Sequence, residues 1–299
     1  MALMLRRLQS AGLDSVAANE IYGSYTTLAV PVFSLVPSLI TPISLSLIPS
    51  LTAEIARKNG KRGAEVADRA MRMTTLLAIP SAMGISLYAR PILSLLFSGQ
   101  REAIDIAAPL LSVLGISVLF SGIITVTNAI LQAHGQTIKP VISMGVGAFV
   151  KIILAYWLIG MPEIGAYGAP ISTLVCDITV ATVNICAVFK TFNGAETERK
   201  NGLGIFRVFV RPFAASILAM AVSLLSFFAA DRIIGSDALA FMVALTAAVI
   251  SYVAFAFLTG AVEREDLKEI AAFNKILKII DTLQKNKKDD ITERKKNDG

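Results

Sequence analysis

Two ionisable residues, Lys151 and Asp177, each interrupt a long apolar segment of the chain. Lys151 lies about ten residues before, and Asp177 about eleven residues after, a short turn between Met161 and Ala166. At about 1.5 Å per helical residue, both would lie about 15 Å deep, near the middle of a hydrocarbon layer about 30 Å thick. A lone charge at that depth costs about 2.5–3.5 kcal/mol on insertion scales. Because helices joined by a short turn are normally neighbours, we expect the two side chains either to pair directly or to face a common wet cavity.

Two interpretations of this pair stay open. In the first, Lys151 contacts a substrate and Asp177 couples transport to an ion or a proton. In the second, the two residues form a structural pair that offsets the cost of burying both charges. Replacing each residue by a neutral one and assaying transport distinguishes the two interpretations.

Two further polar groups are candidate sites. Asn128 and Gln132 form a polar patch in the third apolar segment, where interhelical hydrogen bonding is the simpler explanation and substrate contact the other. Arg6 and Arg7 are suited to a phosphate-bearing headgroup, but ordinary anchoring at the membrane interface explains them more simply. The sequence has no phosphate-binding loop, no Ser-His-Asp set and no zinc-ligand spacing. We therefore expect no catalytic residue, no metal, no cofactor and no enzymatic activity.

The elements that position these residues are about seven apolar segments, each long enough to cross a bilayer. Hydrophobic residues make up 55% of the chain and charged residues 17%, against about a quarter charged in soluble domains. The sequence therefore predicts an all-α integral membrane protein. The net charge of +6 does not indicate nucleic acid, because the basic residues flank the apolar segments and suit lipid headgroups. The predicted spans are 25–52, 71–97, 105–133, 137–160, 166–189, 207–230 and 237–260.

Four prolines lie in the first span, and each removes a backbone donor from the helix. We expect this helix to be bent or locally unwound. The bend is either a hinge between two transport states or a static kink, and the sequence favours neither. The hinge candidates are Pro31, Pro37, Pro42 and Pro49.

Basic residues gather in alternate connections, which predicts the orientation of the chain. The connection at 57–72 and the connection at 190–211 carry most of them and should face the cytoplasm. The C-terminus is then cytoplasmic, and the protein is expected to be multi-pass in the cytoplasmic membrane. Arg90 and Arg101 run against this pattern, because they fall on the opposite side.

Several short strings, taken in order, resemble the polysaccharide-exporter and sporulation-protein branch of the multidrug/oligosaccharidyl-lipid/polysaccharide (MOP) flippase superfamily. The strings are residues 7–12 (RLQSAG), 22–23 (YG), 47–50 (LIPS), 130–136 (ILQAHGQ) and 165–173 (GAYGAPIST). The resemblance implies two six-helix lobes around a central cavity plus two final helices, with this chain matching the eighth to fourteenth helices. It also implies that a lipid-linked sugar is carried by alternating access without ATP.

The chain departs from the family pattern at three places. Relatives that flip lipid II carry an arginine near the outer start of the eighth helix, where this chain has residues 21–25 (IYGSY). His134 and Pro170 replace the commoner Leu and Ala, and Asp177 belongs to no motif of the family. The resemblance therefore does not assign the sugar, and the role of Asp177 rests on its depth alone.

The predicted spans, the resemblance and the composition of the C-terminal part divide the chain into five parts. These are an outer segment (1–23) after a missing or truncated helix, lobe helices (24–190), a loop with two accessory helices (191–260), an amphipathic interfacial helix (261–283) and a disordered charged tail (284–299). The expected partners are membrane lipids, a lipid-linked sugar, and an N-terminal lobe that is either missing, a separate chain or replaced by a second copy. Two other functions stay open: a cation-coupled multidrug exporter with the same fold, and a membrane scaffold for envelope-synthesis enzymes.

Overall fold

The computed structural model describes residues 2–58, 60–161, 163–193, 206–234 and 237–261, and every regular element in them is a helix. The predicted interfacial helix (261–283) falls outside these ranges except for its first residue, and the predicted disordered tail (284–299) lies wholly outside them. The elements are α1 Ala2–Ser10, α2 Ser15–Ser24, η1 Tyr25–Ala29, α3 Val30–Ala56, α4 Gly60–Leu87, α5 Ala89–Leu96, α6 Arg101–Ala133, α7 Ile138–Ile159, η2 Gly165–Tyr167, α8 Gly168–Asn193, η3 Phe206–Val210, α9 Arg211–Ile234 and α10 Asp237–Leu258.

Within the described ranges, seven helical stretches are long and apolar enough to cross a membrane, as the sequence predicts. Their bounds are Ser15–Ala56, Gly60–Leu87, Arg101–Ala133, Ile138–Ile159, Gly165–Phe192, Val208–Ile233 and Leu239–Leu258. The protein is therefore a multi-pass α-helical membrane protein.

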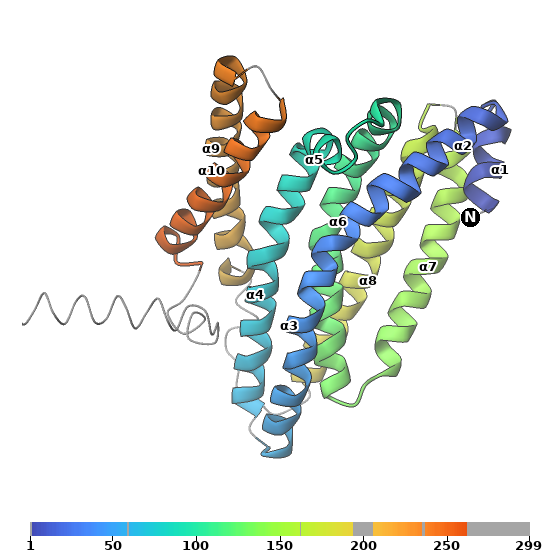
Figure 1. Cartoon of the computed structure of the whole chain (residues 1–299). Helices are drawn as coiled ribbons and strands as arrows, with labels where there is room; N and C mark the ends of the chain where they lie inside the picture. The colour runs from blue at the N-terminus through green and yellow to red at the C-terminus, as the bar shows by residue number, and fades with distance from the viewer. Residues whose placement is uncertain (1, 59, 162, 194–205, 235–236, 262–299) are drawn as a thin grey trace, which may run out of the picture.

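The second span differs from the predicted 71–97, because α4 begins at Gly60 and ends at Leu87. A separate short helix, α5, then runs to Leu96. Pro91 explains the break, since it has no N–H to bond the Leu87 carbonyl and so cannot continue α4. The break turns α5 across one end of the bundle (Figure 1).

The first span is continuous, and its irregular part lies ahead of the prolines. Residues 25–29 form η1, a π-helical turn in which the Val30 N–H bonds the Tyr25 carbonyl. Pro31 follows directly and supplies no donor for the Thr27 carbonyl, which disfavours regular α-helical bonding at this point. Pro37, Pro42 and Pro49 stay inside α3 without interrupting it. The π-helical turn therefore lies just before Pro31, and Figure 1 shows that α2 and the lower part of α3 run at different inclinations.

The long helix α6 occupies the middle of the bundle and packs against α3, α4 and α8, while α7 packs on α8 (Figure 1). Small residues allow these close approaches. A Cβ added at Gly122 of α6 would come within 3.1 Å of Ala78 and 3.2 Å of Ile40 and Thr74. Gly122 therefore marks a point where α3, α4 and α6 all approach closely.

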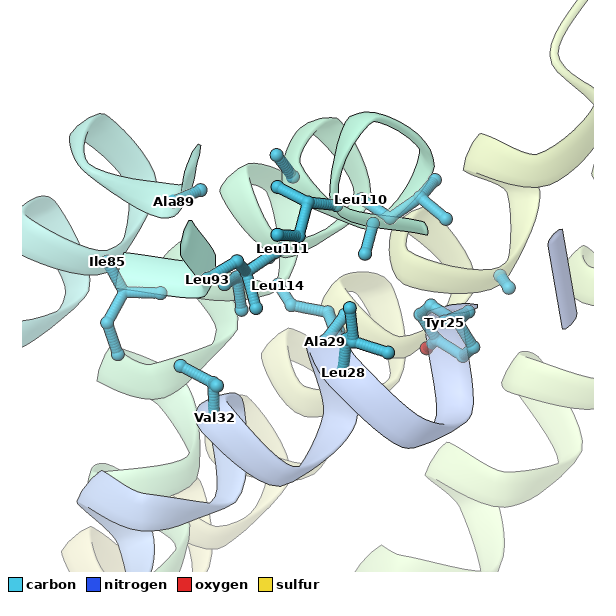
Figure 2. Close-up of a cluster of buried hydrophobic side chains, with 14 of the residues drawn as sticks. Tyr25, Leu28, Ala29, Val32, Ile85, Ala89, Leu93, Leu110, Leu111 and Leu114 are labelled. Atoms are coloured by element: carbon cyan, nitrogen blue, oxygen red, sulfur yellow. The ribbon is translucent and has the colours of Figure 1, made fainter. Parts of the chain in front are cut away.

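A buried apolar cluster ties η1 and α3 to α5 and α6 (Figure 2). Leu28 and Val32 come from the first span, Leu93 from α5, and Leu111 and Leu114 from α6. This cluster fixes the upper part of the first span, including the π-helical turn, against the centre of the bundle.

The last two helices, α9 and α10, pair with each other and pack on α4 and α5. The Tyr252 hydroxyl donates to the Leu76 carbonyl at 2.7 Å, and the Tyr88 and Ser223 hydroxyls are hydrogen-bonded at 2.8 Å. These bonds attach the α9–α10 pair to α4 and to the start of α5.

Candidate functional site

Asp177 on α8 faces α6 and is partly buried. The Ser121 hydroxyl of α6 donates a hydrogen bond of 3.0 Å to its Oδ2. A hydrogen bond from a neighbouring helix lowers the cost of placing a carboxylate within the membrane. Ser121 is a site residue that the sequence analysis missed.

Lys151 lies on the same face of α7 as three buried residues, Pro140, Ser143 and Gly147. Its own side chain is exposed, and among the described residues it forms no ion pair with Asp177 within 4 Å. The two charges interact electrostatically through a longer separation. Direct pairing is therefore not the arrangement in this structure, and a shared wet cavity stays a prediction.

Tyr25 joins this group from the π-helical turn η1. Its side chain is buried, its hydroxyl interacts with the Thr173 side chain one turn before Asp177, and the Asp177 charge acts on it. We call Tyr25, Ser121, Lys151, Thr173 and Asp177 the Asp177 cluster. The cluster joins four membrane spans and places the irregular turn of the first span beside the carboxylate.

A second polar group centres on Asn184 of α8, which is fully buried. Its Nδ2 donates to Asn128 Oδ1 at 2.7 Å and to Thr127 Oγ1 at 3.1 Å, both on α6. The Ser143 hydroxyl of α7 donates to Asn184 Oδ1 at 2.6 Å. Asn128 is therefore in an interhelical network, as the simpler interpretation proposes, and Asn184 and Ser143 are members that the sequence analysis missed.

Gln132 is not brought into this network. Its side chain is exposed, and no hydrogen bond joins it to the part of the chain that the structure describes. It lies one turn beyond Asn128, toward the end of α6. A role in substrate contact stays a prediction for Gln132.

Arg7 connects α1 to the end of α7. Its Nε donates to the Tyr156 carbonyl at 3.0 Å, and its guanidinium lies 3.8 Å from the centre of the Tyr156 ring. This cation–π contact and hydrogen bond hold α1 on α7. Arg6 is exposed. The two neighbouring arginines therefore have different surroundings, and only Arg7 has a structural partner within the described residues.

One face of α3 is exposed and rich in hydroxyl groups and prolines. The hydroxyls of Ser34, Ser38 and Thr41 bond carbonyls four residues earlier in the same helix, so they leave the helix intact while presenting polar surface. Pro31 and Pro42 are exposed beside them. We call these five residues the α3 polar face. Leu35 and Leu45 are exposed on the same side of the helix, so the surface is mixed, and its hydroxyl groups suit a water-filled cavity or another protein segment.

An apolar cavity of about 340 Å³ lies between α3, α4, α5 and the α9–α10 pair. Nearly all of its lining is hydrocarbon, and the hydroxyls of Tyr88 and Tyr252 in that lining already bond neighbours. Its lining includes Val36, Leu76, Pro80, Met220, Phe241 and Tyr252. The cavity suits a hydrocarbon chain better than a polar group.

A family model described as lipid II flippase MurJ matches residues 15–243. Three curated relatives come from Bacillus subtilis (strain 168). The uncharacterized membrane protein YabM is 26% identical over 226 residues, which cover 76% of this chain and 39% of the relative. The lipid II flippase MurJ is 30% identical over 149 residues, which cover 49% of this chain and 27% of the relative. Stage V sporulation protein B is 23% identical over 278 residues, which cover 92% of this chain and 50% of the relative. The chain thus spans half or less of the length of these relatives.

Two solved structures have a similar fold. One is a MOP superfamily transporter from Pyrococcus furiosus, with a TM-score of 0.54 and 16% identity over 91% of this chain and 63% of the other. The other is a multidrug resistance MATE family transporter of the MOP superfamily in an inward-facing conformation. Its TM-score is 0.52, with 15% identity over 83% of this chain and 55% of the other. At these identities the likeness concerns the fold alone.

Proposed function

This chain belongs to the lipid II flippase MurJ family, within the MOP flippase superfamily, and from this premise we propose that it takes part in moving a lipid-linked oligosaccharide or polysaccharide precursor across the cytoplasmic membrane. The observation that carries the proposal is the family match, which runs from α2 into α10. Such transport serves cell-envelope or spore-wall synthesis and needs no catalytic residue.

The proposal includes a second lobe that faces the α3 polar face. Ser34, Ser38 and Thr41 are exposed in the middle of a membrane span, where a water-filled cavity between two lobes would hydrate them. The second lobe is supplied by another part of the same polypeptide, by a separate chain or by a second copy. This chain without a second lobe is expected not to flip lipid.

The Asp177 cluster is proposed as the coupling site. It has a single carboxylate among three hydroxyl groups, and the Lys151 ammonium acts on that carboxylate, which suits a proton better than a metal cation that needs several carboxylate ligands. Because Tyr25 lies in both the cluster and the π-helical turn, we expect a change of charge at Asp177 to affect the part of the first span next to Pro31. Coupling then means that the bend at this turn differs between the charged and neutral states.

Lys151 is proposed as the substrate contact. Its ammonium group is the exposed member of the Asp177 cluster and has no ion pair among the described residues. A phosphate of a lipid-linked sugar is a suitable partner, whereas a cationic drug is repelled by it. This charge favours the lipid-linked precursor over the multidrug alternative.

The test is a deletion of the gene in its native cells, followed by analysis of lipid-linked precursors in the membrane. We expect precursors to accumulate on the inner leaflet, and the wild-type gene to reverse this. Asp177→Asn and Lys151→Gln should fail to reverse it at normal protein levels, whereas Lys190→Gln, an exposed lysine near the end of α8, should succeed. Unchanged precursor distribution after the deletion would refute the proposal.

A further inference from the structure

The short helix α5 lies at the end of the bundle opposite the α3–α4 turn (Figure 1). Two adjoining cavities lie beside it. The first has a volume of about 710 Å³ and a polar lining that includes Ser98, Arg101 and Asp105. The second, of about 400 Å³, is mainly apolar. Arg90 and Ser94 line both, so the two cavities meet at α5. We call the two together the α5 site.

The polar cavity carries a net positive charge. Arg90 forms an ion pair with Asp105 of α6, which holds its guanidinium at the junction of the two cavities. Arg101, the first residue of α6, has no hydrogen bond or ion pair with any residue that the structure describes. With two arginines and one aspartate, the lining has one positive charge without a partner. Its serine hydroxyls add further donors.

These two arginines are the ones that run against the distribution of basic residues along the chain. They lie at the end of the bundle opposite the connection at 57–72, so the positive-inside rule does not account for them. A local role at the α5 site explains their position. Guanidinium groups are well suited to phosphate, which they can bind through two parallel hydrogen bonds.

The apolar cavity extends from this charge toward α9. Leu87 and Pro91 form one side, and Leu224, Phe227 and Phe228 form the other. The two phenylalanine rings lie 6.0 Å apart at 76°, an edge-to-face contact that gives this wall a fixed shape. Phe228 and Leu87 are exposed, so the cavity opens toward the surrounding lipid.

We propose that the α5 site binds an anionic diacyl phospholipid of the membrane, with its phosphate on Arg101 and Arg90 and one acyl chain along Phe227 and Phe228. A cationic pocket joined to an apolar one is complementary to an amphiphile with a charged head. The membrane supplies such lipids at all times, and the apolar cavity opens to it. This inference does not depend on the transported substrate.

The test compares binding of phosphatidylglycerol and phosphatidylcholine with identical chains to the detergent-purified protein, by native mass spectrometry. We expect phosphatidylglycerol to bind preferentially and Arg101→Gln to weaken its binding about tenfold, because a charge-assisted bidentate contact is lost. Arg232→Gln is the matched control, since Arg232 is an exposed arginine of α9 that lines neither cavity. Its binding should equal that of the wild type.

Equal binding of the two lipids by the wild-type protein would overturn the proposal, and this comparison needs no variant. Equal weakening by Arg101→Gln and Arg232→Gln would overturn it as well, because the effect would then be one of general charge. Glycerol phosphate, which has the headgroup but no chains, should not compete at equal concentration. Full competition by it would mean that the site takes a soluble phosphate and not a lipid.

Discussion

Replacement of Asn184 by leucine should destabilise the packing of α6, α7 and α8. Asn184 makes three interhelical hydrogen bonds, of 2.6, 2.7 and 3.1 Å, and is fully buried. Interhelical hydrogen bonds in membrane proteins contribute about 0.6 kcal/mol each on average, so the loss of three predicts about 2 kcal/mol. Leucine has the same branching and the same number of side-chain heavy atoms as asparagine, so the change removes the bonds without leaving a cavity.

The assay is reversible unfolding in mixed micelles, measured as the free energy of unfolding of each variant. Thr182→Val is the control on the same helix, because Thr182 is exposed and its hydroxyl bonds only the Ile178 carbonyl of α8. Its effect should stay within about 0.5 kcal/mol. If Asn184→Leu and Thr182→Val were equally stable, the network would not hold the helices together and the reasoning would be wrong.

A double-mutant cycle assigns part of this energy to one bond. Ser143→Ala alone should cost less than Asn184→Leu, because the single hydroxyl proton of Ser143 is shared between Asn184 Oδ1 and the Pro140 carbonyl of its own helix. Combining Ser143→Ala with Asn184→Leu should show a coupling of about 0.6 kcal/mol. Strict additivity would show that the 2.6 Å contact contributes no stability.

Three further predictions concern transport and packing. Asp177→Asn should reduce precursor export by at least about tenfold, whereas the control Asp231→Asn on α9 should leave export unchanged. Equal export by the two variants would show that Asp177 has no part in the mechanism. Pro31→Ala restores a backbone N–H for regular α-helical bonding. Amide hydrogen exchange in residues 25–31 should therefore slow, and precursor export should fall. Faster exchange in these residues would contradict the prediction. Gly122→Ala should lower the free energy of unfolding by about 1–3 kcal/mol, because the added Cβ would lie 3.1 Å from Ala78. Gly145→Ala is the control and should not lower it, because the space around Gly145 is open. Equal effects of the two substitutions would refute the close approach at Gly122.

Composition and hydropathy were sufficient to predict the number of spans, because each span must satisfy its backbone internally and stay apolar over about 20 residues. The end of the second span was harder to predict. Residues 88–97 continue the apolar pattern, and only Pro91 marks the place where α4 ends at Leu87. A proline four residues after a carbonyl is the local signal for that break.

The site was predictable in part. Lys151, Asp177 and Asn128 stand out because polar groups inside apolar helices are costly. Asn184 carries the same signal, but its partners lie 41, 56 and 57 residues away, and nothing in the local sequence identifies them. Ser121 and Tyr25 give weaker signals, because hydroxyls are common in membrane helices and commonly bond their own backbone. Their place beside Asp177 depends on how the helices pack.

The most direct test of the central claim is a flipping measurement on the protein purified from native membranes with whatever chains accompany it. The preparation is reconstituted into vesicles with a fluorescent lipid-linked sugar, and the rate at which the label becomes accessible to an impermeant quencher is recorded. We predict a rate well above that of protein-free vesicles, and a rate near theirs for the Asp177→Asn preparation. Wild-type vesicles that flip no faster than protein-free vesicles would contradict the assignment as part of a flippase.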